Sequence, residues 1–223
     1  MDKKWLIAIP VALAFIGAAA LLLNREKHQT VEKQTEPLPE TRAQTEETLP
    51  PLPDSVLYYG TVLEVIRDEE GKLSKLSMES PRDGAYVMNL GEPTLYVDSG
   101  EHKAFDPETL QKDDRIYVFH SPMVARSLPP QAAAFLIEKN IPMDASCGMY
   151  HRAEEVRQQG EDLVITIESG ERELLVDGDT RLWTYEGEKA EKDQILEDAF
   201  VIAWYWDRGE KTLRCGDLMV LPK

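Results

Sequence analysis

The amino-acid sequence predicts a mainly β protein in which two tandem copies of a small β domain follow an apolar segment and a disordered linker. Three observations support this prediction: a run without charges near the N-terminus, a change of composition before residue 55, and a pattern of short apolar runs that occurs twice beyond it. We expect the apolar segment over residues 1–23, the linker over 24–54, the first β domain over 55–142 and the second over 143–223.

The first feature is a run of 19 residues, from Trp5 to Leu23, without a charged side chain. A helix of this length can cross the roughly 30 Å hydrocarbon core of a bilayer. Lys3 and Lys4 precede the run, and a short basic N-terminal region normally stays inside while a long following domain is exported. We therefore expect a single-pass transmembrane anchor in the cell membrane with an extracytoplasmic C-terminal part. The alternative is a secreted protein, because Ala18–Ala20 could form the cleavage site of a signal peptide.

The linker at residues 24–54 is rich in Thr, Glu, Gln and Pro and contains the stretches EPLPE and LPPLP. It has almost no large apolar residues and so cannot bury a core. Prolines stiffen such a chain toward polyproline II, and its own charges keep it extended. We interpret it as a spacer that holds the following domains away from a bilayer, which favours the anchor over the secreted form.

The net charge of −16 lies mostly beyond the linker. This negative field repels nucleic acid and anionic lipid headgroups, so we expect no nucleic-acid partner. Solubility of an exported domain explains the charge, and loose binding of divalent cations is the alternative, although no EF-hand-like loop supports it. We expect neither a metal nor another cofactor.

An internal duplication is the most informative feature of the chain. The first copy has YVMNLGEPTLYV and then LQKDDRIYVFH, and the second has RELLVDGDTRLW and then ILEDAFVIAWYW. Thr94 pairs with Thr180, and Asp114 pairs with Asp198 once a difference of two residues is placed in the connecting loop. This alignment matches Ile116 with Phe200, Val118 with Ile202 and His120 with Trp204.

The order of elements within each copy indicates a barrel. Short apolar and β-branched runs alternate with turn signals such as Asp68–Gly71 and Pro81–Gly84, as in a β-sandwich or β-barrel. Asp106-Pro107-Glu108 offers an N-cap and a first-turn proline for one helical turn, and Glu188–Glu197 takes that place in the second copy. Three strands, a helical turn and two more strands are the order of an OB-like barrel.

The stretch SLPPQAAAFLIEKNIP, residues 127–142, is locally ambiguous. Its prolines followed by Gln131 and three alanines favour a short helix by propensity. As the fifth element of a repeated β domain, however, the stretch should be a strand. We predict a loop over Ser127–Gln131 and then a strand, because prolines, which lack an amide donor, suit a crossing at a sheet edge.

Three sequence stretches resemble a known module. KDDRIYVFHSPMVARSLPPQAAAFLI in the first copy, with AWYWD and LMVLP in the second, is similar to a tandem β module of exported Gram-positive proteins. That module is often found ahead of the copper amine oxidase N-terminal-like "stalk" domain. The resemblance covers roughly Leu57–Pro222 and implies a Ser-x-Pro-Pro-Gln loop followed by a closing strand, with no assigned activity and no copper ligands. We take Ser127, Pro129, Pro130 and Gln131 of this loop as candidate ligand-binding residues. Arg208–Cys215 stands where the loop motif would recur, so only the first copy carries it.

The titratable and nucleophilic residues do not indicate an enzyme. Ser127 lacks the context of a GxSxG or Ser-x-x-Lys nucleophile. His102, His120 and His151 are scattered without metal-ligand spacing. His120 shares a strand face with Ile116, which favours a packed, hydrogen-bonded histidine over a base or ligand.

The aromatic segment FVIAWYW, residues 200–206, is apolar on both alternating faces. One face must fill the barrel, and the other needs a cover. The cover could be the first domain, a helix, or a bound glycan or peptide. Trp204 and Trp206 are therefore candidate ligand-binding residues, with packing between domains as the alternative.

Two cysteines, Cys147 and Cys215, fall on the first and last expected strands of the second copy. In an exported domain a disulfide between them could join the strand ends, and two free thiols are the alternative.

These observations together predict a membrane-anchored, extracytoplasmic, non-catalytic β module that binds or scaffolds at the cell envelope. The expected partners are the membrane, through the N-terminal helix, and a cell-wall glycan, a peptide or an envelope protein. A cell-envelope hydrolase or transferase with an unrecognised site is the alternative.

Overall fold

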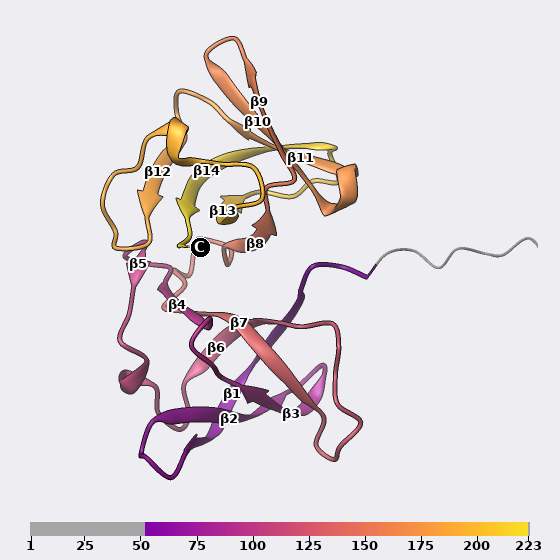
Figure 1. The fold of residues 1–223 in the computed structure, drawn as a ribbon, viewed down its shortest axis with the longest axis vertical. Coiled ribbons are helices and arrows are strands. Elements are labelled where there is room, and N and C mark those ends of the chain that lie inside the picture. The colour runs from indigo at the N-terminus through magenta and orange to yellow at the C-terminus, as the bar shows by residue number, and fades with distance from the viewer. Residues whose placement is uncertain (1–51, 223) are drawn as a thin grey trace, which may run out of the picture. The chain divides into compact units, whose positions relative to one another are not determined.

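The computed structural model describes residues 52–222, which form β-strands joined by turns and three short 3-10 helices (Figure 1). The prediction of a mainly β protein is confirmed. The expected anchor at residues 1–23 and nearly all of the linker lie outside the described residues. Within residues 52–222, no helix is long and apolar enough to cross a bilayer.

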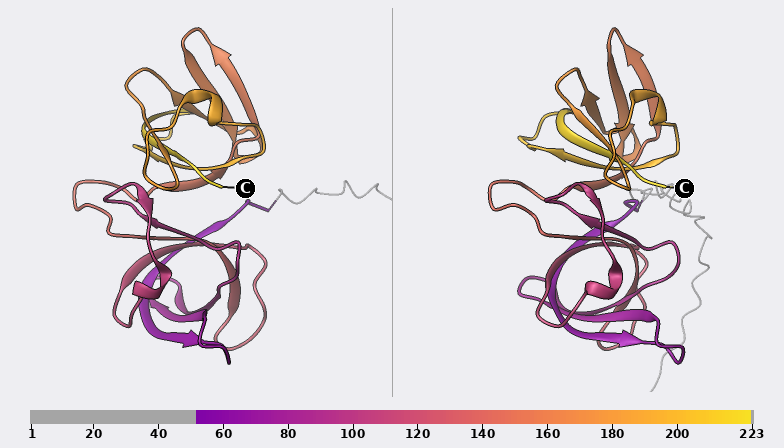
Figure 2. Two further views of the ribbon diagram at one scale, coloured as in Figure 1. Left: turned by 60° about the vertical axis from the view of Figure 1, so that its left-hand side comes forward. Right: turned by 90° about the vertical axis from the view of Figure 1, so that its left-hand side faces the viewer.

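Five strands of the first half close into a barrel, in the order β1, β2, β3, β7, β6 and back to β1. The β3–β7 pair is parallel and the other pairs of the ring are antiparallel. Figure 2 shows these strands, in purple to pink, curling into a ring. The elements are β1 (Val56–Arg67), β2 (Leu73–Ser80), β3 (Gly84–Asn89), β4 (Leu95–Asp98), β5 (Lys103–Ala104), η1 (Pro107–Thr109), β6 (Arg115–His120) and β7 (Gln131–Lys139).

The second half forms a second sheet with the same neighbours, in the order β9, β10, β11, β14, β13 and β8. Here β8 and β9 take the place of the single strand β1, which has a bulge between Val62 and Glu64. The elements are β8 (Met149–Arg152), β9 (Glu155–Gln159), β10 (Asp162–Ile167), η2 (Glu168–Gly170), β11 (Arg172–Val176), β12 (Arg181–Thr184), η3 (Lys192–Gln194), β13 (Phe200–Tyr205) and β14 (Thr212–Val220).

The hydrogen-bond ladders repeat residue by residue, which supports the predicted duplication. The Thr94 hydroxyl donates to the Ala134 carbonyl at 2.9 Å, and the Thr180 hydroxyl donates to the Cys215 carbonyl at 2.9 Å. The pairing of Thr94 with Thr180 is thus confirmed. Corresponding positions also fill the cores of the two halves: Leu76, Met88, Ile116 and Ile137 in the first, and Ile165, Leu174, Val201 and Leu218 in the second.

The predicted pairing of Asp114 with Asp198 is wrong by one residue. Asp113 and Asp198 both have left-handed backbones, with φ of 73° and 61°, and their amides donate to the Val62 and Ala153 carbonyls. Asp113 therefore corresponds to Asp198. The correction shifts every match on the following strand, so Phe119 rather than His120 corresponds to Trp204.

The ambiguous stretch is a loop followed by strand β7, as predicted. Ala132 and Ala134 are buried in the first core while Ala133 is exposed. This alternation has the period of a strand, so burial of every second side chain overrides the helical propensity of the alanines. The Pro130 carbonyl accepts a hydrogen bond from Val87 at 2.9 Å, which ties the loop to β3.

The predicted helical turn is also present, as η1. The Asp106 carboxylate accepts a hydrogen bond from the Glu108 amide at 3.0 Å and so caps the turn. In the second half, η3 occupies the corresponding place.

Both cysteines are free thiols, so the disulfide left open by the sequence is not formed. Cys215 is buried in the second core, whereas Cys147 is half-buried in the segment before β8. Burial raises the pKa of the Cys147 thiol to about 11 and that of Cys215 to about 12, so both stay protonated at neutral pH.

Candidate functional site

A third apolar cluster, which we call the seam, joins the two halves. Strand β13 explains it: Val201 and Ala203 point into the second core, while Ile202 and Trp204 point out. The first half covers these outward side chains. It is therefore the cover that the second apolar face of this strand needs. The buried residues of the seam are Val97, Phe119 and Leu136 from the first half and Ile202, Trp204, Met219 and Leu221 from the second.

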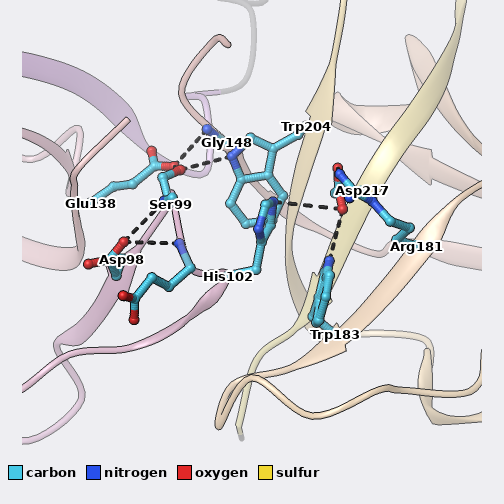
Figure 3. Close-up of polar contacts among 11 residues, drawn as sticks. Asp98, Ser99, His102, Glu138, Gly148, Arg181, Trp183, Trp204 and Asp217 are labelled. Atoms are coloured by element: carbon cyan, nitrogen blue, oxygen red, sulfur yellow. Dashed lines mark hydrogen bonds and ion pairs between the residues drawn. The ribbon is translucent and has the colours of Figure 1, made fainter. Parts of the chain in front are cut away.

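A chain of hydrogen bonds crosses the seam (Figure 3). The Trp204 indole donates to the Ser99 hydroxyl at 2.9 Å, and Ser99 donates to the Glu138 carboxylate. The same Glu138 oxygen, Oε1, accepts from the Gly148 amide at 2.8 Å. Glu138 is 0% exposed, and among the described residues its Oε2 has no partner. Burial raises the pKa of Glu138 to about 7, because a buried carboxylate loses its hydration.

His102 lies on the other side of Trp204. Its imidazole stacks on Trp183 at 5.2 Å and meets Trp204 edge-on at 4.7 Å. Asp217 accepts from the Arg181 guanidinium at 2.7 Å and from the Trp183 indole at 2.9 Å, while His102 Nε2 is 3.7 Å away. Burial lowers the pKa of His102, so the neutral ring packs between the halves.

Ser99, Glu138 and His102 contain the residue types of a hydrolase, but their placement does not fit catalysis. Ser99 is only 1% exposed, and its hydroxyl already joins the Trp204 and Glu138 groups. A nucleophile needs an open path to substrate as well as a base. These three residues therefore hold the seam together. Among the described residues, no group of three His, Cys, Asp or Glu side chains could hold a metal ion.

An open groove lies beside the seam and is formed by two adjoining cavities that share Asp54 and Tyr150. The volume of the larger is about 760 Å³ and that of the smaller about 370 Å³, within the range of ligand sites. We call these two cavities the seam groove. The larger is lined by Asp54, Glu92, Pro93, Leu95, Phe135, Tyr150, Asp198, Ala199, Phe200 and Pro222.

Three aromatic rings form the apolar wall of the groove. The rings of Tyr150 and Phe200 stack at 5.0 Å with an interplanar angle of 5°, and the Phe135 ring lies 6.4 Å from Tyr150. The three side chains are half-buried. They come from strands β8, β13 and β7, so both halves contribute to the wall.

The charged lining of the groove is acidic. Asp54, Glu92 and Asp198 line the larger cavity, and Glu168 and Glu171 line the smaller together with Asp54. Among the described residues, no Lys or Arg lines either cavity. Arg152, at the rim, pairs with Asp198 at 3.2 Å and lies 3.9 Å from Asp54.

His151, which lines the smaller cavity, does not reduce this negative charge. Its Nε2 contacts the Tyr205 hydroxyl at 2.9 Å, and burial lowers its pKa to about 4. The ring is therefore neutral at physiological pH. His120 is likewise buried, and its Nδ1 contacts the Ser121 carbonyl at 2.8 Å, as expected for a packed histidine.

The candidate residues from the sequence lie outside the seam groove, the loop at Ser127–Gln131 in one place and the two tryptophans of the β13 segment in another. Ser127, Pro129, Pro130 and Gln131 form the loop before β7 and its first residue, where the Ser127 hydroxyl donates to the Pro129 carbonyl at 2.7 Å. None of these four residues lines the seam groove. Trp204 is 8% exposed inside the seam, which matches the packing alternative. Trp206 is 72% exposed and lines a shallow cavity with Arg208 and Arg214.

Sequence reasoning missed the aromatic wall of the groove. Phe200 belongs to the segment whose two apolar faces called for a cover, so that signal was present. Phe135 and Tyr150 carried no such signal.

Comparisons with known proteins give no family. No protein-family model matches the chain, and no curated protein matches it. One solved structure, described as "Structure of murine DNA binding protein bound with ds DNA", is 10% identical, and the match covers 75% of this chain and 96% of that chain. Its TM-score of 0.25 is too low to support a shared fold or function.

Proposed function

We propose that the chain is a non-catalytic ligand-binding module that acts at the cell envelope and uses the seam groove as its binding site. The groove supports the proposal because it combines a half-buried aromatic wall with a few polar groups in an accessible volume. This combination is typical of binding sites. In this proposal residues 5–23 anchor the chain in the cell membrane, and the linker holds residues 55–223 on the extracytoplasmic side.

We further infer that each half is an OB-like barrel. The first half runs β1, β2, β3, then η1, then β6 and β7, with the short strands β4 and β5 inserted before η1. The second half runs in the same order if β8 and β9 are counted as one strand, with η2 and β12 inserted. In each half the third and the last strand of this order pair in parallel, β3 with β7 and β11 with β14. This connectivity supports the OB-like assignment. On this view the seam packs the same face of each barrel, because Phe119 and Trp204 occupy corresponding positions.

The hydrolase alternative has less support from the geometry. The Ser127 hydroxyl is engaged by a carbonyl rather than by a base, and Ser99 is sealed inside the seam. His151, the histidine that lines the groove, is neutral and contacts Tyr205. None of these arrangements offers an activated nucleophile next to open space.

A binding screen tests the proposed function. The full chain in lipid nanodiscs is applied to an array of cell-wall glycans and peptides, together with the variants Tyr150→Ala, Trp206→Ala and Pro130→Ala. We expect binding that Tyr150→Ala weakens more than tenfold and that the other two variants retain. A ligand lost only with Trp206→Ala or Pro130→Ala would move the site to those residues, and no ligand that distinguishes any variant would leave a structural role.

The location is tested separately. Fusions of alkaline phosphatase and of green fluorescent protein to Lys223 report which side of the membrane the C-terminus occupies. We expect an active phosphatase and a dark fluorescent protein, and the reverse result would place the module in the cytosol.

A further inference from the structure

Strand β8 has a free edge beside the seam groove. It pairs with β13 on one side and, among the described residues, with no other strand. Met149, Tyr150 and His151 all line the smaller cavity. Because successive side chains of a strand point to opposite faces, a cavity that touches three in a row runs along the strand edge.

The opposite wall of the smaller cavity leaves this edge available. Residues 52–55 line the cavity, but no backbone hydrogen bond in the described part of the chain joins them to β8. Glu168 and Ser169 of η2, with Glu171, complete the wall. An extended chain therefore has space beside β8 and unpaired strand groups to bond with.

The charge of the seam groove indicates which kind of peptide it can bind. Five carboxylates line the two cavities. Two guanidinium groups lie near them: Arg152, which pairs with Asp198, and Arg172, which pairs with Asp207 and also acts electrostatically on Glu168. Glu92 and Glu171 have no ion pair among the described residues, and Glu168 faces a neutral His151 at 3.8 Å. Charge complementarity favours a cationic partner and disfavours an anionic one.

We propose that the seam groove binds an extended, lysine- or arginine-bearing peptide that adds as a strand to the free edge of β8. In strand addition, main-chain hydrogen bonds supply affinity and alternate side chains supply specificity. Here one set of alternate side chains contacts the Phe135–Tyr150–Phe200 wall, and the other set meets Glu168 and Glu171. This inference rests on the groove being the binding site, and it adds the class of ligand and its mode of binding.

The test uses a fluorescein-labelled peptide of alternating valine and lysine, eight residues long, and the full chain in nanodiscs. Two matched peptides accompany it: one with glutamate in place of lysine, and one with N-methyl groups on alternate amides, which keeps the charge but blocks strand pairing. The protein variants are Glu168→Gln with Glu171→Gln, and, as a matched control away from the groove, Glu186→Gln with Glu188→Gln. All four glutamates are exposed, so the substitutions spare the cores.

We expect fluorescence anisotropy to show binding of the lysine peptide and none of the glutamate peptide. The Glu168→Gln, Glu171→Gln variant should weaken binding about three- to tenfold, because each exposed ion pair contributes modestly, and the control variant should not. N-methylation should weaken binding more than tenfold.

Several results would overturn the inference. The lysine peptide could fail to bind, or the N-methylated peptide could bind as well as its parent, which would indicate charge attraction without strand pairing. A glycan whose binding depends on Tyr150 would refute the peptide inference while leaving the binding module intact.

Discussion

At the scale of the residue, burial of the Glu138 carboxylate in the seam carries an electrostatic cost. Its carboxylate has two hydrogen-bond donors on one oxygen and none among the described residues on the other. Leaving a buried charge half satisfied is unfavourable, so the protonated form is preferred over a wider pH range. The seam is therefore stronger when this side chain is neutral.

The first prediction concerns Glu138→Gln. A carboxyl with a pKa of 4.5 when unfolded and about 7 when folded stabilises the fold fully below pH 4.5, and this stability is lost as pH rises to about 7. The loss is about 3 kcal/mol in the free energy of unfolding. The glutamine variant should lack it while retaining acceptors for Ser99 and Gly148, as measured by urea denaturation from pH 4.5 to pH 8.

His151 acts in the opposite sense and must be separated from this effect. Its lowered pKa, about 4, means that its contribution is present above pH 6.5 and is lost as pH falls toward 4. Both proteins contain His151, so the difference between their pH profiles isolates Glu138. Parallel profiles would show that Glu138 does not titrate in this window.

The second prediction concerns Gly148, which lies against the Ile202 and Trp204 side chains of strand β13. A Cβ at this position would meet the Ile202 side chain and lie 2.8 Å from the Trp204 ring. Gly148→Ala should therefore destabilise the fold by about 1–3 kcal/mol through overpacking. Gly178→Ala is the matched control, because nothing lies within 4 Å of its added Cβ, and its effect should stay within about 0.5 kcal/mol. Equal denaturation midpoints for the two variants would contradict the packing at Gly148.

At the scale of elements, a threonine just before β4 and another just before β12 each add a side-chain hydrogen bond to the backbone ladder that joins these strands to β7 and β14. Thr94→Val and Thr180→Val remove hydrogen bonds to the Ala134 and Cys215 carbonyls. We expect each to cost about 1–2 kcal/mol, with the larger effect for the more buried Thr94. Because the two sites lie in different halves, the double variant should show the sum within about 0.5 kcal/mol. A neutral effect at one site alone would mean that the two halves do not use this contact equally.

The elements could be predicted from the sequence where repetition supplied information beyond local propensity. The strand over Gln131–Ile137 could be predicted because the corresponding segment of the second half reads as extended. The alternating burial of the alanines agrees with this prediction. The register of β13 was missed because Asp113 and Asp114 are chemically alike, and only the left-handed backbone at Asp113 identifies the match. Two neighbouring aspartates look the same in the sequence, so the residue types alone do not show which of them has the left-handed backbone.

The seam groove could not be predicted in the same way. Phe135, Tyr150 and Phe200 come together only when strands from both halves pack across the seam. Each ring alone is an ordinary half-buried strand residue. The free edge of β8 is equally a property of the assembled sheet, since no residue type marks it.

At the scale of the whole molecule, the seam determines whether the two halves behave as one unit. Each half has its own buried core, which alone would permit independent unfolding. The seam adds a third buried cluster and the hydrogen bonds from Trp204 to Ser99 and from Tyr185 to Tyr96. Coupling of this kind makes a single cooperative transition the expected behaviour of the wild type.

The last prediction is that Trp204→Ala separates the two halves during unfolding. The change removes the largest side chain of the seam and its indole donor, and comparable truncations cost about 3–5 kcal/mol. The cores of both halves keep all their residues, because Trp204 belongs to neither. Differential scanning calorimetry should therefore show one transition for the wild type and two for Trp204→Ala, whereas Trp206→Ala, on an exposed side chain, should keep one. A single transition in Trp204→Ala, only shifted to lower temperature, would mean that the remaining seam contacts suffice for coupling.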